Sequence, residues 1–252
     1  MKNIKLTVQY DGTNYCGWQK QEKVKTIQGE LEEAIFKLTG VYPELNGCSR
    51  TDSGVHAIAH ISNFFTESPI PAEKFFRALN AFLPGDIRVK DSIEESEEFH
   101  SRFSCIGKKY VYRIYCCTTK SALLTSRAGY EPKQLDIAAM KQAAEFFVGE
   151  FDFKAFCSVG GTALTSVRRI LDTQVYERES VYGGTEIFFE VAGTGFLYNM
   201  VRIMTGTLIS VGKGQKKPED VRSIILSGDR RNAGVTVPPQ GLYLKEVYYG
   251  TI

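Results

Sequence analysis

The residue types best suited to chemistry lie in one short stretch, residues 46–57, with the sequence NGCSRTDSGVHA. It places a carboxylate, Asp52, two positions after a guanidinium, Arg50, among small polar residues that favour a loop. A loop anchored by a strand is a common place for a catalytic group, and Arg50 would keep such a carboxylate ionised. An aspartate before Ser-Gly also commonly closes an Asx-turn, and spacing alone does not separate the two interpretations.

A second candidate is Tyr110, in the alternating run at 109–117. It is either one strand tyrosine in a row of aromatic residues or a flat platform on which a flipped base stacks. In the second case the neighbouring cations Lys108, Lys109 and Arg113 would bind phosphates.

Two further residues have alternative interpretations. Arg202 lies in the run FLYNMVRIM, one position beyond an apolar stripe, where an arginine usually extends its head group into solvent. It could instead turn inward and pair with a buried carboxylate. Trp18, in the loop at 14–21, can stack on a nucleotide or simply hold its own loop against the protein.

Other motifs give weaker evidence of a functional site. Gly193-Thr194-Gly195 precedes a helix, but Tyr198 stands where a dinucleotide-binding motif needs its third glycine. His56 and His60 have a metal-ligand spacing, yet Ala57 replaces the glutamate of zinc proteases and the segment looks extended. We therefore predict no metal, and His56 as a structural hydrogen-bonding residue. No phosphate loop or serine-histidine-aspartate order occurs, so an enzyme here would use carboxylate chemistry without a cofactor.

Hydrophobic periodicity, together with capping and turn residues, predicts both helices and strands throughout the chain. The expected strands are 4–10, 57–65, 87–89, 109–117, 167–176, 185–191 and 242–249, and the strands at 167–176 and 185–191 are expected to join around Gly183-Gly184. One expected helix is capped by Thr26, runs through about residue 39 and stops at Gly40, and another is capped by Asp136 and runs through 147. The other expected helices are one opened by Pro71 with Phe75, Leu79 and Phe82 on its apolar side, one over 197–211, and one from 218 to 228. The acidic run at 94–98 reads as a solvated connector. This order predicts two related α/β halves with fused sheets and a cleft between them.

Composition sets broad limits. The 252 residues are 43% hydrophobic and 24% charged, which is ordinary for a globular protein. No apolar run approaches the roughly 18 residues that span a bilayer, and the first residues do not resemble a signal peptide. Six cysteines without a Cys-x-x-Cys pair predict a reducing cytoplasm. A net charge of +2 neither requires nor excludes nucleic acid.

Five separated motifs together resemble the tRNA pseudouridine synthase A family. They are YDGTNYCGWQ at 10–19, RTDSGVHA at 50–57, KKYVYRI at 108–114, FLYNMVRIMTG at 196–206, and the closing RNAG with PPQGLYL at 231–244. The resemblance spans residues 4–249. The family's usual Thr-Ala-Pro-Pro is replaced by Thr236-Val237-Pro238-Pro239, a conservative departure.

The resemblance implies roles for individual residues. It makes Asp52 the catalytic carboxylate and Tyr110 a residue that contacts the target base. It places Arg202 beside the catalytic aspartate and makes Leu242 an apolar wall of the uridine pocket. Either Arg50 or Arg202 would keep Asp52 charged, and the resemblance does not decide between them.

The resemblance also implies the overall organisation and activity. The fold would be α+β, with a mixed, mostly antiparallel central sheet flanked by helices and an active-site cleft between two halves. Residues 1–104 would carry the catalytic loop, and residues 105–252 would complete the sheet and the cleft in one integrated catalytic unit. The activity would be isomerisation of uridine to pseudouridine at positions 38–40 of the tRNA anticodon arm, without cofactor or metal, by a cytoplasmic homodimer. Two alternatives are a non-catalytic RNA-binding protein and a metal-dependent hydrolase built around His56 and His60.

Overall fold

The computed structural model describes residues 1–161 and 163–250, and the chain divides into two compact units. The N-terminal unit consists of Met1–Ile106 together with the chain from Tyr243 onward, and the C-terminal unit is Gly107–Leu242. The division falls two residues after the predicted boundary at 104, and the last strand groups with the N-terminal unit. The integration of the halves into one catalytic unit stays a prediction.

The sheet of the N-terminal unit is built on the first strand, in which apolar Ile4, Leu6 and Val8 alternate with polar residues and are fully buried. This strand pairs antiparallel with a neighbour on each side, in the order β4-β1-β3. The last strand joins β3 in parallel at Tyr243 and His56. The strands are β1 (Lys2–Tyr10), β2 (Asn46–Gly47), β3 (His56–Thr66), β4 (Ile87–Glu95) and β10 (Leu242–Tyr249).

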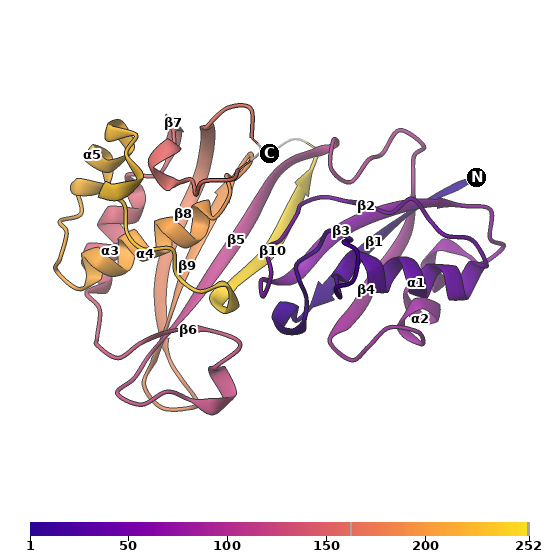
Figure 1. The fold of residues 1–252 in the computed structure, drawn as a ribbon, viewed down its shortest axis with the longest axis horizontal. Helices are drawn as coiled ribbons and strands as arrows, with labels where there is room; N and C mark the ends of the chain where they lie inside the picture. The colour runs from indigo at the N-terminus through magenta and orange to yellow at the C-terminus, as the bar shows by residue number, and fades with distance from the viewer. Residues whose placement is uncertain (162, 251–252) are drawn as a thin grey trace. The chain divides into compact units, whose positions relative to one another are not determined.

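Two helices accompany this sheet (Figure 1). Helix α1 (Ile27–Thr39) has the predicted caps, because Thr26 accepts a hydrogen bond from the N–H of Gly29 and Gly40 takes a left-handed φ of +78°. Helix α2 (Phe75–Asn80) is shorter than predicted and packs on β4. Phe82, predicted on its apolar side, lies beyond its end and is 45% exposed, so that part of the prediction is wrong.

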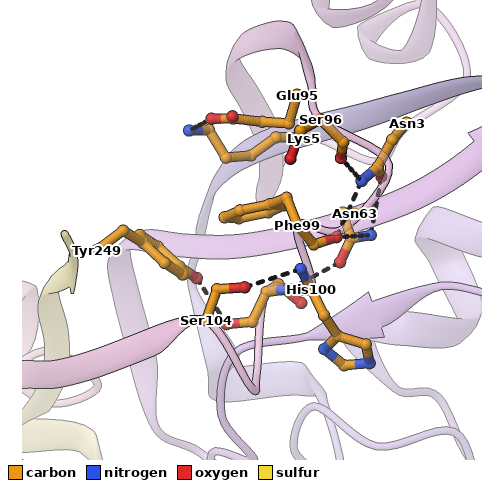
Figure 2. Close-up of polar contacts among 10 residues, drawn as sticks. Asn3, Lys5, Asn63, Glu95, Ser96, Phe99, His100, Ser104 and Tyr249 are labelled. Atoms are coloured by element: carbon orange, nitrogen blue, oxygen red, sulfur yellow. Dashed lines mark hydrogen bonds and ion pairs between the residues drawn. The ribbon is translucent and has the colours of Figure 1, made fainter.

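A buried polar network holds residues 96–104 against the N-terminal sheet (Figure 2). The Asn3 side-chain amide donates to the carbonyls of Ser96 and Phe99, and Asn63 donates to Asn3. Tyr249 donates to the carbonyl of Ser101 at 2.7 Å. The predicted solvated connector is therefore anchored, and its first part belongs to β4, which runs six residues beyond the predicted end at 89.

The strands of the C-terminal unit follow the order β5-β9-β8-β7, with antiparallel neighbours, and β6 pairs parallel to β5. Positive φ values at Gly183 and Gly184 form the predicted β8–β9 hairpin turn. The strands are β5 (Cys105–Cys116), β6 (Gly129–Glu131), β7 (Gly149–Asp152), β8 (Val167–Glu179) and β9 (Thr185–Gly193).

The α-helices in the described part of this unit (Figure 1) are α3 (Ile137–Glu145), α4 (Met200–Gly212) and α5 (Asp220–Ser227). Helix α3 packs on β8 and on α4, and Asp136 caps it as predicted. Helix α4 begins at Met200 rather than at 197, because Asn199 has a left-handed φ of +61° that interrupts the helical path.

Mixed, mostly antiparallel strand pairing with helices in both units confirms the predicted α+β class. Among residues 1–161 and 163–250, no helix is long and apolar enough to cross a membrane.

Candidate active site

Asp52 lies in the connection between β2 and β3, in a tight turn that leads directly into β3. The N–H of Val55 donates to the carbonyl of Asp52 at 3.1 Å, and Gly54 takes a φ of +76°. The side chain of Asp52 is half-buried, and its neighbours Thr51 and Val55 are buried. Main-chain contacts thus close this turn, and Asp52 lies just before the start of β3.

The segment after β1 holds the Asp52 loop from the other side. The N–H of Trp18 donates to the carbonyl of Thr51 at 3.0 Å. The carbonyl of Tyr15 accepts from the N–H of Gly54 at 3.4 Å and from the hydroxyl of Ser53 at 3.1 Å. Two motifs that are far apart in the sequence therefore form one hydrogen-bonded structure around Asp52.

Two residues make this close approach possible. Gly17 has a φ of +85°, and a Cβ there would lie 2.5 Å from the carbonyl oxygen of Thr51. The hydroxyl of Tyr10 shares a 2.7 Å hydrogen bond with the Thr51 hydroxyl, both buried. Glycine at position 17 is thus required both by conformation and by space.

The two histidines and the tryptophan support this loop. The Nδ1 atom of His56 accepts from the N–H of Gly12 at 3.0 Å, as expected of a structural hydrogen-bonding residue. His60 contacts the carbonyl of Ser49 through Nε2 at 2.9 Å, and its ring stacks on Trp18 with centroids 3.6 Å apart. Trp18 is only 3% exposed, so it holds its loop in place and presents no open face to a nucleotide. Within residues 1–161 and 163–250, no group of three potential metal ligands occurs.

The side chain of Arg50 is exposed at the start of the turn. Apart from position 162 and the last two residues, which are not described, it forms no hydrogen bond or ion pair with the chain. Its role beside Asp52 stays a prediction.

In the C-terminal unit, Tyr110 lies on β5 opposite Val191 of β9. Tyr110 is 7% exposed, and its ring packs nearly perpendicular to the ring of Phe196, with centroids 5.1 Å apart and planes at 82°. A base would therefore reach the limited accessible part of Tyr110 rather than a broad open ring face. The contact with a base stays a prediction.

The cations near Tyr110 differ in their partners. Arg113 forms an ion pair with Glu186, Nη2 to Oε2 at 2.8 Å, and Lys109 lies 3.5 Å from a carboxylate oxygen of Glu190. These two cations are thus already neutralised by the sheet, which disfavours the predicted phosphate-binding role for them.

Arg202 lies in the first turn of α4 and is half-buried. Its Nε donates to the carbonyl of Val237 at 2.7 Å and its Nη1 to the side chain of Asn199 at 2.6 Å. Asn199 in turn donates to the Ser158 hydroxyl at 3.0 Å. The guanidinium is therefore fixed in direction by the protein, and it does not simply extend into solvent.

Leu242 begins β10 and is buried. The residue before it, Gly241, packs against the ring of Tyr112, where a Cβ would lie 2.5 Å from Cζ. The hydroxyl of Tyr112 donates to the carbonyl of Pro238 at 2.8 Å. Burial raises the pKa of this hydroxyl well above its usual range, so it remains a donor. Residues 237–242 are thus held by both Arg202 and Tyr112.

The sequence did not single out the crossing of residues 234–235 over α4. A Cβ on Gly206 would lie 1.9 Å from the carbonyl oxygen of Val235, and the N–H of Gly234 donates to the Thr207 hydroxyl at 2.9 Å. Arg230 holds the same segment through the carbonyl of Gly234 at 2.8 Å. This crossing sets where residues 237–242 begin. The signal available in the sequence was Gly206 itself, a glycine inside a predicted helix.

Comparison with known proteins decides the family. A family model described as tRNA pseudouridine synthase matches residues 6–104 and 143–250. The chain is 50% identical over 250 residues to tRNA pseudouridine synthase A of Caldicellulosiruptor bescii, covering 99% of this chain and 100% of that protein. It is 50% identical over 249 residues to the protein of the same name from Clostridium botulinum strain Alaska E43, with the same coverage. The chain belongs to the tRNA pseudouridine synthase family.

The resemblance found in the five motifs is thereby confirmed. In this synthase, Arg50 and Asp52 belong to the N-terminal unit, and Tyr110, Arg202 and Leu242 to the C-terminal unit. The departure at Val237 leaves its contact with Arg202 intact, because Arg202 binds the main-chain carbonyl, which any residue supplies.

Proposed function

We propose that this chain isomerises uridine to pseudouridine at positions 38–40 of the tRNA anticodon arm, with Asp52 as the catalytic carboxylate. The observation that carries the proposal is the full-length identity of about half to proteins named tRNA pseudouridine synthase A. The rigid main-chain support of the Asp52 turn agrees with it, because a catalytic group must be held in place before the substrate binds.

The reaction breaks the N1–C1′ bond, turns the base, and joins C5 to C1′. The proton of C5 is lost and N1 gains one, so the conversion is redox-neutral and needs no added reagent. Asp52 either attacks the substrate covalently or abstracts the 2′ proton, and both routes need the carboxylate ionised. Arg202 or Arg50 would keep it so through a charge-assisted hydrogen bond.

The target uridine must leave its stack to reach Asp52, at a cost of about a few kcal/mol. Contact with Tyr110 and with the apolar side chain of Leu242 would offset part of that cost. Leu242 is buried where β10 begins, which suits a wall of a base pocket.

The test is tritium release from C5-labelled uridine in unmodified tRNA transcripts, with chelator present throughout. The parent protein is expected to release tritium, and Asp52→Asn to bind tRNA normally but release none, because an amide cannot act as nucleophile or base. Asp91→Asn, which changes an exposed carboxylate on β4, is the matched control and should keep full activity. Turnover by Asp52→Asn would refute the assignment of Asp52.

The alternative, an RNA-binding protein without catalysis, makes a different prediction in the same assay. If that alternative holds, the parent protein binds tRNA but releases no tritium. A metal-dependent hydrolase would lose its activity to the chelator.

We further propose that the protein works as a cytoplasmic homodimer. The family resemblance supports the dimer. All six cysteines are free, which agrees with a reducing compartment.

A further inference from the structure

The Gly193-Thr194-Gly195 motif at the end of β9 has a packing role. A Cβ on Gly193 would lie 3.0 Å from the carbonyl oxygen of Arg169 and 3.2 Å from the Phe196 ring. The glycine therefore lets the chain fold back so that Phe196 meets Tyr110. The dinucleotide interpretation of this motif has no support in this geometry, but the residues beside it are cationic.

Two cations lie on the same end and the same face of this sheet. Lys108 of β5 is paired in register with Gly193, and Gly193 is paired with Ile170 of β8. Arg168 precedes Ile170 by two residues, and Lys108 precedes Tyr110 by two. Because side chains alternate along a strand, Lys108 and Tyr110 share one face, as do Arg168 and Ile170.

These two cations lack the carboxylate partners that Lys109 and Arg113 have. The cross-strand neighbour of Arg168 is Phe151 and that of Lys108 is Gly193, neither of which is charged. Within residues 1–161 and 163–250, neither Lys108 nor Arg168 forms an ion pair. On the opposite face, Glu150 is the cross-strand neighbour of Arg169. On the face of the sheet that carries Tyr110, Lys108 and Arg168 are thus cations at the Gly193 end with no ion pair among the described residues.

The guanidinium of Arg168 is oriented by its own loop. Its Nη1 donates to the carbonyls of Thr165 at 2.8 Å and Val167 at 2.6 Å. These carbonyls fix the direction of the group without neutralising it. In the described residues, no hydrogen bond uses Nε or Nη2 of Arg168, and that edge is the fork with which arginine binds phosphate.

We propose that Lys108 and Arg168 bind backbone phosphates of the RNA substrate on one side of the nucleotide that contacts Tyr110. This inference rests on the proposed function, since it takes Tyr110 as the residue next to the target uridine. Two cations placed on one side of this nucleotide would hold the adjoining stretch of the strand while the base leaves its stack. Contacts of this kind position the RNA without reading its sequence.

The experiment measures the affinity of the full-length protein for an unmodified tRNA transcript at several KCl concentrations. Each lost phosphate contact lowers the magnitude of the slope of log affinity against log salt by about 1. Arg168→Gln and Lys108→Gln should each show this change, with about five- to tenfold weaker binding at low salt. In the double variant the magnitude of this slope should be smaller than in the parent by about 2.

Two controls make the result specific. Arg222→Gln removes the same charge from an exposed position on α5 of the same unit and should leave slope and affinity unchanged. Arg168→Lys keeps the charge but not the fork, so it should keep the slope and recover part of the affinity.

A slope in Arg168→Gln equal to that of the parent and of Arg222→Gln would overturn the inference. Equal losses in Arg168→Lys and Arg168→Gln would also overturn it, because the effect would then come from packing. The proposed function is tested separately by tritium release from the parent protein. A parent that releases tritium, with an unchanged slope in Arg168→Gln, would remove only the phosphate contact.

Discussion

At the scale of single residues, the Asp52 loop depends on a glycine outside it. Gly17 is required by its left-handed φ and by its contact with the Thr51 carbonyl. We expect Gly17→Ala to lower the stability by about 1–3 kcal/mol, from backbone strain and overpacking together. The added methyl group would also move Thr51 and Asp52, so turnover should fall more than the loss of folded protein explains.

Gly40→Ala is the control for this prediction. Its φ of +78° gives the same backbone strain, but nothing lies within 4 Å of the added Cβ. Melting temperature and tritium release measured on both variants separate strain from displacement. Equal activity per folded molecule in the two variants would show that Gly17 does not position the loop.

At the scale of elements, one buried carboxylate joins three strands of the C-terminal sheet. Glu186 of β9 accepts from Arg113 of β5 at 2.9 Å, from Arg178 of β8 at 2.9 Å, and from Ser180 at 2.8 Å. Burial acts to raise the pKa of Glu186, but these donors outweigh it and hold the pKa below its usual value. The folded protein therefore binds the proton less tightly than the unfolded chain does. The stabilisation is present above the pKa of the unfolded chain and is lost as the pH falls through the folded one.

We expect Glu186→Gln to be less stable than the parent at pH 7, because two guanidinium groups lose their counter-charge. The difference should shrink from about pH 5 downward, as the parent itself becomes protonated. Urea unfolding at a series of pH values measures it. Glu179→Gln, at an exposed position on β8, should follow the parent at every pH. A difference for Glu186→Gln that stays constant down to pH 3 would contradict the assigned ion pairs.

At the scale of the whole molecule, the homodimer is the remaining prediction. Light scattering coupled to gel filtration should give twice the mass of one chain across a range of concentrations. The expectation comes from the family resemblance. A mass of one chain at every concentration would remove the dimer from the proposal.

Local sequence was enough for much of this protein. The alternation of Ile4, Leu6 and Val8 predicted β1, and the caps Thr26 and Gly40 predicted the limits of α1. Such signals are readable because they depend on neighbours a few residues away. The five motifs were also enough to indicate the family, since each is a contiguous run.

Tertiary structure decided the roles that depend on distant partners. Stacking on His60 makes Trp18 a buried support, and the carbonyl of Val237 fixes the direction of Arg202. A carboxylate on a neighbouring strand neutralises Arg113, whereas Arg168 has no carboxylate partner among the described residues. A cation's partner is set by strand register and by which face each side chain occupies. These depend on pairing between segments far apart in the chain, which no local pattern records.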